Sequence, residues 1–145
     1  MEYKINMKRL LLLAFCSVLS SCDPYSEARL CNDSSTDLQI TIRIDREFVK
    51  ENWPGDQSVR FLKEFVDSNE LIELTIDTVS LQGVYKLERG KCSILYEGIS
   101  STPRFMFNYL KVDYRDTSIV YGTVNDIEQA FLVSDRGKHE LAIKD

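Results

Sequence analysis

Cysteine and histidine have the side chains best suited to nucleophilic or metal chemistry, and this chain has few of them. Its 145 residues include one histidine and four cysteines, namely Cys16, Cys22, Cys31 and Cys92. There is no Cys-x-x-Cys pair and only one histidine, so the pattern predicts no metal site. His139 is the one imidazole able to serve as a general base. It follows an expected turn at residues 135–138, where a solvated surface histidine is the common case.

The sequence also lacks the motifs that organise known catalytic centres. It has no Gly-x-Ser-x-Gly nucleophile elbow, no His-Glu-x-x-His zinc motif and no glycine-rich phosphate loop. Its 23 acidic residues would be enough for the carboxylate pair of a hydrolase, but nothing singles out two of them. Most alternate with apolar residues, where they keep a domain soluble. We therefore expect a protein that is not an enzyme and holds no cofactor of its own.

A mainly apolar run before Cys22 indicates export. Lys8 and Arg9 precede residues 10–19, and small residues follow the run, which is the order of a secretory signal. The run is about half of the roughly 20 residues that a helix needs to cross a bilayer. We therefore expect no permanent transmembrane helix. Met1 and Met7 are both suitable start residues, and the sequence does not choose between them.

The signal ends in Leu19-Ser20-Ser21-Cys22, an apolar residue followed by two small residues and a cysteine. This motif resembles the lipobox of bacterial lipoproteins. The resemblance implies that a type II signal peptidase removes residues 1–21 and that Cys22 carries an N-acyl diacylglycerol. It also implies a small β-rich lipoprotein of a Gram-negative envelope, anchored to the outer membrane. The alternative is an ordinary secreted protein in which Cys22 keeps its thiol.

The rest of the chain is predicted to form a short tether, residues 22–27, and a single domain, residues 28–145. A domain of this length buries about two thirds of its unfolded surface, which is enough for one core. Cys31 and Cys92 remain inside it, and outside the cytoplasm such a pair predicts a disulfide; two buried free thiols are the alternative. The formal net charge of −5 makes nucleic acid an unsuitable partner.

Short alternating segments predict that this domain is all-β. Residues 38–45 alternate apolar and polar side chains with the period of a half-buried strand. Similar segments recur about every 8–12 residues, separated by turns, which is typical of a sandwich or barrel. We expect strands at residues 28–31, 38–45, 70–79, 84–88, 91–97, 104–114, 118–124, 127–134 and 139–143.

The predicted fold is an antiparallel β-sandwich, immunoglobulin-like or similar, with the Cys31–Cys92 bridge between its two sheets. An open lipocalin-like barrel is the alternative. Residues 57–68 fit a short helix slightly better than a strand, because charged side chains gather on one helical face and apolar ones on the other. Residues 47–52 carry no clear pattern.

The aromatic segment 104–114 is the most distinctive candidate binding surface. On a regular strand, Phe105, Phe107 and Tyr109 would share one face. If they are buried, the segment is a central strand; if exposed, it is a platform for sugars or for a partner's apolar side chains, which Trp53 and Tyr121 would extend.

Two function hypotheses follow. The first is a non-enzymatic lipoprotein domain that acts by binding an envelope protein. The second is a module that binds a carbohydrate or another small ligand through an aromatic face. An envelope hydrolase is a third hypothesis, which would need His139 or a carboxylate pair in a cleft.

Overall fold

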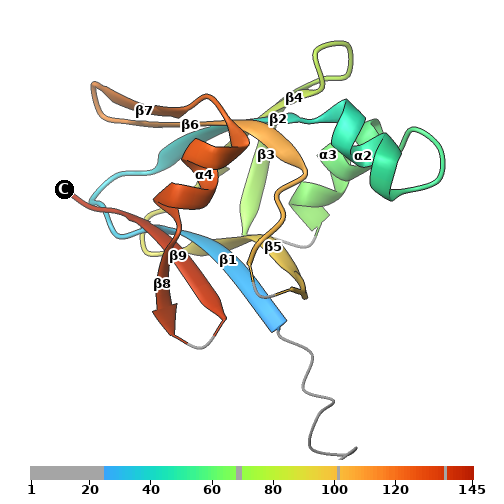
Figure 1. Cartoon of the computed structure of the whole chain (residues 1–145). Coiled ribbons are helices and arrows are strands. Elements are labelled where there is room, and N and C mark those ends of the chain that lie inside the picture. Colours follow the sequence, from blue (N-terminus) through green and yellow to red (C-terminus); the bar gives the residue numbers. More distant parts are fainter. Residues whose placement is uncertain (1–24, 68–69, 101, 136) are drawn as a thin grey trace, which may run out of the picture.

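Two β-sheets and three short helices make up the domain (Figure 1). The structure is a computed structural model that describes residues 25–67, 70–100, 102–135 and 137–145. The predicted signal, the lipobox and Cys22 lie outside the described residues. In chain order the elements are β1 (Tyr25–Asn32), β2 (Leu38–Ile44), α2 (Arg46–Asn52), α3 (Ser58–Asp67), β3 (Leu71–Asp77), β4 (Gln82–Leu87), β5 (Cys92–Ile99), β6 (Phe107–Tyr114), β7 (Thr117–Tyr121), α4 (Val124–Ala130), β8 (Leu132–Asp135) and β9 (Lys138–Ile143).

The strands form a four-stranded sheet in the order β5-β1-β9-β8 and a five-stranded sheet in the order β3-β4-β2-β6-β7. Neighbouring strands are antiparallel, except that β1 and β9 are parallel. The all-β prediction is thus correct for the two sheets but misses the helices α2 and α4 and the parallel pair. The described strands do not close into a barrel.

The core contains the apolar residues of the alternating segments. On β2, Leu38, Ile40, Ile42 and Ile44 are buried, while Gln39 and Arg43 on the other face are exposed. This confirms the alternation predicted for residues 38–45. Burying one such side chain stabilises a fold by about 1.5–3 kcal/mol relative to leaving it in water, so the strand is held mainly by this face.

The helices test the sequence predictions most sharply. The predicted helix at residues 57–68 is confirmed by α3. Residues 46–52, most of which carry no clear pattern in the sequence, form α2. The Asp45 carboxylate caps its N-terminus and accepts hydrogen bonds from the backbone N–H groups of Glu47 and Phe48 at 3.1 and 3.2 Å.

Helix α4 replaces the end of the strand predicted at 118–124 and the first part of the strand predicted at 127–134, while β7 and β8 confirm the remainder. The cause is a capping box. The Thr123 hydroxyl accepts from the Asp126 backbone N–H at 3.2 Å, and the Asp126 carboxylate accepts from the Thr123 backbone N–H at 3.1 Å. Strand β7 therefore ends at Tyr121, and the chain returns to a strand only at Leu132.

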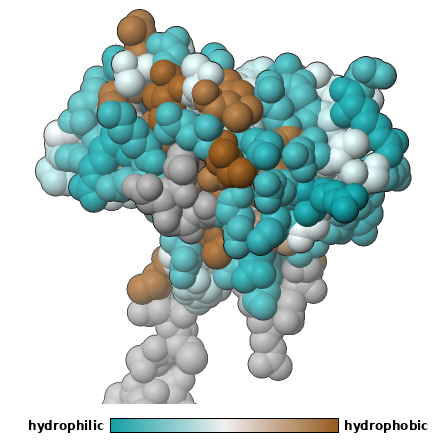
Figure 2. Space-filling view, turned by 180° about the vertical axis from the view of Figure 1, so that it is seen from behind, coloured by the Kyte–Doolittle hydropathy of each residue, from teal (hydrophilic) through white to brown (hydrophobic). Residues whose placement is uncertain are grey.

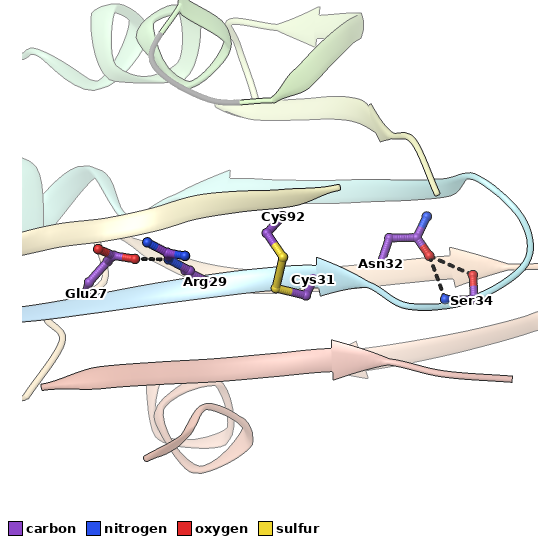
Figure 3. The surroundings of a disulfide bond; sticks show 6 residues. All are labelled: Glu27, Arg29, Cys31, Asn32, Ser34 and Cys92. Carbon is purple, nitrogen blue, oxygen red and sulfur yellow. Dashed lines mark hydrogen bonds and ion pairs between the residues drawn. A yellow bond between two sulfur atoms is a disulfide. The ribbon is translucent and has the colours of Figure 1, made fainter. Parts of the chain in front are cut away.

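The predicted disulfide is present, but it joins different elements than expected. Cys31 on β1 and Cys92 on β5 lie directly opposite each other, with their sulfur atoms 2.09 Å apart (Figure 3). Because β1 and β5 are neighbours in the four-stranded sheet, the bridge lies within that sheet. The prediction of an inter-sheet bridge is wrong.

The residue after Cys31 makes the connection between the sheets. The Asn32 side chain is buried and donates hydrogen bonds to the carbonyl oxygens of Thr36, at 2.8 Å, and of Leu87 on β4, at 3.1 Å. Its Oδ1 atom accepts from the backbone N–H and the hydroxyl of Ser34 at 3.1 and 2.7 Å (Figure 3). Asn32 thus fixes the turn predicted at residues 32–37 and ties β1 to the five-stranded sheet.

Candidate functional site: an apolar cleft beside strand β5

A cleft of about 280 Å³ lies between the helices α2 and α3 on one side and strand β5 on the other. Trp53 forms part of its helical wall. The Trp53 backbone N–H donates to the Val49 carbonyl at 2.9 Å and ends α2, so the indole follows directly from the helix. The chain then turns through Gly55, whose φ of 76° favours glycine, and returns as α3. This turn brings Phe61 against Trp53, with ring centroids 5.0 Å apart.

Contacts with the core hold helix α3, and so the helical wall of the cleft, in position. Its Leu62 and Phe65 side chains are buried. The hydroxyl of Tyr85 on β4 donates to the Leu62 carbonyl at 2.8 Å, and burial raises the pKa of that hydroxyl well above its usual range. Phe65 also packs edge-on against Phe107 at 6.0 Å. With these residues in the core, Phe61 is left to face the cleft.

The opposite wall is formed by four consecutive residues of β5, Ile94 to Glu97. In the pairing with β1, Arg29 faces Ile94 and Ala28 faces Tyr96, so Leu95 is the extra residue of a bulge. A bulge re-aims the side chains of its strand. Here Leu95 is buried, while the half-buried Tyr96 ring lines the cleft and rests edge-on against Phe105 at 6.3 Å.

Strand β5 is also an edge strand. Its one neighbour among the described strands is β1, so the edge that faces away from β1 has no strand partner there. Such an edge presents backbone N–H and C=O groups that another extended segment can pair with.

The charged side chains of Glu64, Glu97 and Arg104 line the cleft, and the two glutamates are hydrogen-bonded to other residues. Glu64 accepts from Arg60 at 2.6 Å, and Glu97 accepts from the Tyr25 hydroxyl at 2.6 Å, which raises the pKa of that hydroxyl. Arg104 forms no hydrogen bond or ion pair with any other residue in the described ranges. Among the described residues, the cleft therefore combines apolar walls, a strand edge without a partner and one guanidinium that forms no ion pair.

Of the two alternatives for the aromatic segment, burial is correct for Phe105 and Phe107, and the exposed platform is not formed. Phe105 and Phe107 are 2% and 0% exposed and lie in the core, where their rings contact each other at 5.0 Å. Only Trp53, of the residues proposed for that surface, lines the cleft. Tyr121 is half-buried on β7, paired with Leu110.

A second bulge explains why Tyr109 does not share a face with Phe107. Ile44 pairs with Phe107 and Arg43 with Tyr109, so Asn108 is an extra residue that shifts the alternation by one. Phe107 therefore points into the core, while Tyr109 lies on the outer face with the Arg43 guanidinium 5.0 Å from its ring centroid.

Apart from Trp53, the sequence predictions named no residue that lines the cleft, and the missed residues include Phe61, Tyr96, Arg104 and Met106. A signal existed for Phe61. The helix at 57–68 accounts for Leu62 and Phe65 on its buried face but leaves Phe61 outside it. A large apolar residue beside the buried face of a helix indicates a second contact. Tyr96, Arg104 and Met106 have no such signal, because only the bulge and the β5–β6 connection bring them to the cleft.

The prediction that His139 is a solvated surface residue is wrong as well. It is 8% exposed, on β9 between Ala28 of β1 and Val133 of β8.

Within the described ranges, no three His, Cys, Asp or Glu side chains are grouped so as to hold a metal ion. No helix of the same ranges has the length and apolarity needed to span a membrane.

Comparisons with models of known families, with curated proteins and with solved structures found no match for this chain.

Proposed function

We propose that this protein is a lipid-anchored, non-enzymatic binding domain of a bacterial envelope, and that its cleft holds an extended segment of an envelope protein. The anchor is the acylated Cys22 that the lipobox Leu19-Ser20-Ser21-Cys22 implies, and the membrane of residence is the outer membrane. The observation that carries the binding role is the apolar cleft alongside an open strand edge.

The size and lining of the cleft favour side chains over a whole cofactor. Its volume of about 280 Å³ lies just below the range of small-molecule pockets, which is roughly 300–1,000 Å³. The walls are aromatic and aliphatic, from Trp53, Phe61, Tyr96 and Met106. One or two apolar side chains of a partner would fill this space and bury the rings.

The edge of β5 supports an extended partner rather than a helix. A segment added beside β5 would become the fifth strand of the four-stranded sheet and pair with its free backbone groups. Because residues 94–97 also line the cleft, the same segment would place alternate side chains into it. Backbone pairing would supply affinity, and the cleft would supply specificity.

The charge of Arg104 favours a carboxylate on the bound segment. Glu64 forms an ion pair with Arg60, and one carboxylate oxygen of Glu97 accepts a hydrogen bond from the Tyr25 hydroxyl. A guanidinium with no partner in the described ranges forms paired hydrogen bonds to a carboxylate. The expected partner therefore carries an apolar side chain and a nearby Asp, Glu or terminal carboxylate in an extended stretch.

The glycan hypothesis loses the surface on which it depended. Phe105 and Phe107 are buried, and the Arg43 guanidinium lies over the Tyr109 ring. A platform for flat stacking of sugars would therefore have to come from Trp53 and Tyr96 within the cleft. Binding of a glycan to these two rings is therefore the alternative that the binding test must distinguish from binding of a protein segment.

Anilinonaphthalene sulfonate, an aromatic anion, is a suitable probe because it carries the two features that the cleft should recognise. Trp53 is the only tryptophan and lines the cleft, so a bound probe should quench its emission by energy transfer. We expect saturable quenching that weakens roughly tenfold in Phe61→Ala or Arg104→Ala, the loss of about 1.4 kcal/mol of binding. Val79→Ala, on an exposed turn, is the control that should bind as wild type does.

Competition then separates the partner classes. A short peptide of alternating valine and threonine with one aspartate should displace the probe, whereas the same peptide with a central proline should not, since proline cannot donate to a strand ladder. Displacement by oligosaccharides but not by the alternating peptide would contradict the proposal and favour the glycan. Absence of saturable quenching would remove the cleft as a binding site.

The anchor has its own test in cells. Wild type should incorporate a labelled fatty acid and remain with the membranes, while Cys22→Ala should lose the label and the retention. Cys16→Ala, inside the predicted signal, is the matched control that should be labelled as wild type is. An unlabelled wild type would contradict the proposed acylation and leave the cleft proposal standing.

A further inference from the structure

We propose that the end of the domain where β1 begins lies on the lipid surface, with Tyr25, Ile99, Leu132 and Val133 in the membrane interface. This inference rests on the acylation of Cys22 under the proposed function. It adds an orientation: the domain is laid on the bilayer by a defined apolar end and does not swing freely from its anchor.

The length of the chain between anchor and fold carries the argument. The sequence predicted a tether of residues 22–27, but β1 begins at Tyr25, and Ser26 and Glu27 are already buried within it. Three residue steps therefore separate Cys22 from the folded strand, and they span at most about 11 Å. The start of β1 cannot move away from the headgroup region of a membrane that holds the acyl chains.

Exposed apolar side chains stand at this end of the domain. Tyr25 and Ile99 face each other across β1 and β5 and are 48% and 74% exposed. Leu132 and Val133 on β8 are 71% and 69% exposed. In Figure 1, the start of β1, the end of β5 and the β8–β9 hairpin lie together at the bottom of the molecule.

The strand register gives the position of each of these residues along the direction of β1. Val133 pairs with His139, which pairs with Ala28, three residues along β1 from Tyr25. At about 3.3 Å per residue, this offset is roughly 10 Å. Leu132 pairs with Glu140, which pairs with Arg29, so it lies one residue further, roughly 13 Å from the level of Tyr25. Interfacial helices bury their apolar faces about 5–10 Å deep, so one bilayer surface covers the whole set when it is inclined toward β8.

The residue types also fit an interface. Tyrosine is enriched where proteins meet the headgroups, because its ring is apolar and its hydroxyl polar. The Tyr25 hydroxyl already donates to Glu97, which leaves the ring flank for lipid. Ile99, Leu132 and Val133 contribute aliphatic surface that would otherwise be exposed to water. Figure 2 shows that apolar side chains also gather high on the rear face. A control residue from that distant part of the domain therefore tests whether apolar exposure alone is enough for contact with lipid.

Val79 provides this control. It is 88% exposed on the turn between β3 and β4, at the top of Figure 1, opposite the start of β1. The test uses full-length protein expressed in cells, purified with its acyl chains and reconstituted into phosphatidylcholine vesicles with or without brominated acyl chains. Ile99→Trp and Leu132→Trp are compared with Val79→Trp, and wild type, with Trp53 alone, sets the baseline. Tryptophan fluorescence is recorded for the three variants and for wild type in both kinds of vesicle.

We expect the emission added by Ile99→Trp and Leu132→Trp to be largely lost in brominated vesicles, while that added by Val79→Trp is retained. Vesicle flotation is measured on the same samples. Protein that floats but shows no selective quenching, or equal quenching at Val79→Trp, would overturn the membrane-facing end while leaving the anchor intact. Protein that does not float would overturn the acylation and, with it, this inference.

Discussion

Replacing Phe105 with alanine will lower the free energy of unfolding by about 4 kcal/mol, because the truncation opens a cavity in a dense aromatic cluster. Phe105 is buried, and its ring centroid lies 5.0 Å from those of Phe107 and Phe131 and 6.3 Å from that of Tyr96. The side chain lies between the cleft wall and α4, so its removal leaves neighbours from three elements without contacts.

Urea denaturation followed by circular dichroism will measure this loss. Tyr109→Ala is the matched control, because Tyr109 was predicted to share the face of Phe105 but lies half-buried on the outer side of β6. We expect it to cost about 1 kcal/mol, mostly through the lost contact with Arg43. Equal losses in the two variants would contradict the burial pattern and restore the predicted platform.

Removing both cysteines of the disulfide, as Cys31→Ser with Cys92→Ser, will destabilise the domain by about 4 kcal/mol in the chain-entropy description. The bridge closes a loop with a sequence separation of 61 residues, and the unfolded chain regains that freedom when it is cut. The loss should appear at the unfolding midpoint in urea, with the slope rising if the unfolded chain expands.

Reduction provides an independent measurement of the same effect. Cys92 is exposed, so a thiol reductant can reach the bridge in the folded protein. Reduced wild type should unfold at the midpoint of the double variant, and reductant should leave the double variant unchanged. Two titratable thiols in the untreated native domain would show that the bridge had not formed.

The sequence predicted features that depend on local alternation and on counting. Residues 38–45 carry four buried apolar side chains at alternate positions, and β2 follows them closely. The pairing of Cys31 with Cys92 follows from there being two cysteines in the domain. Neither inference requires knowing which strands are neighbours. The position of the bridge does, and there the prediction failed.

Single-residue irregularities account for the other errors. The extra residues Leu95 and Asn108 shift the alternation within β5 and β6, and nothing in their local sequence distinguishes them from regular strand residues. The helix α4 was missed for a different reason. Its Thr123 and Asp126 carry a capping signal, but the apolar residues around them also fit strands.

The cleft is the feature that the sequence predicted least well. Trp53 ends α2, Tyr96 sits after the β5 bulge, and Arg104 belongs to the β5–β6 connection. Their convergence depends on how α3 packs against β4 and how β5 pairs with β1. Each of these contacts joins segments that are distant in sequence, so no local sequence pattern predicts the cleft.

The parallel pairing of β1 and β9 also sets the order in which the chain can fold. Leu30 pairs with Leu141, so the four-stranded sheet needs the last strand before its second strand has neighbours on both sides. Closing so long a loop is slow, because its entropy is lost before the contacts repay it. The five-stranded sheet, built between β2 and β7, has no such requirement. An emerging chain therefore keeps β1 incomplete until synthesis reaches β9, which would suit the proposed export of this protein through a membrane before it folds.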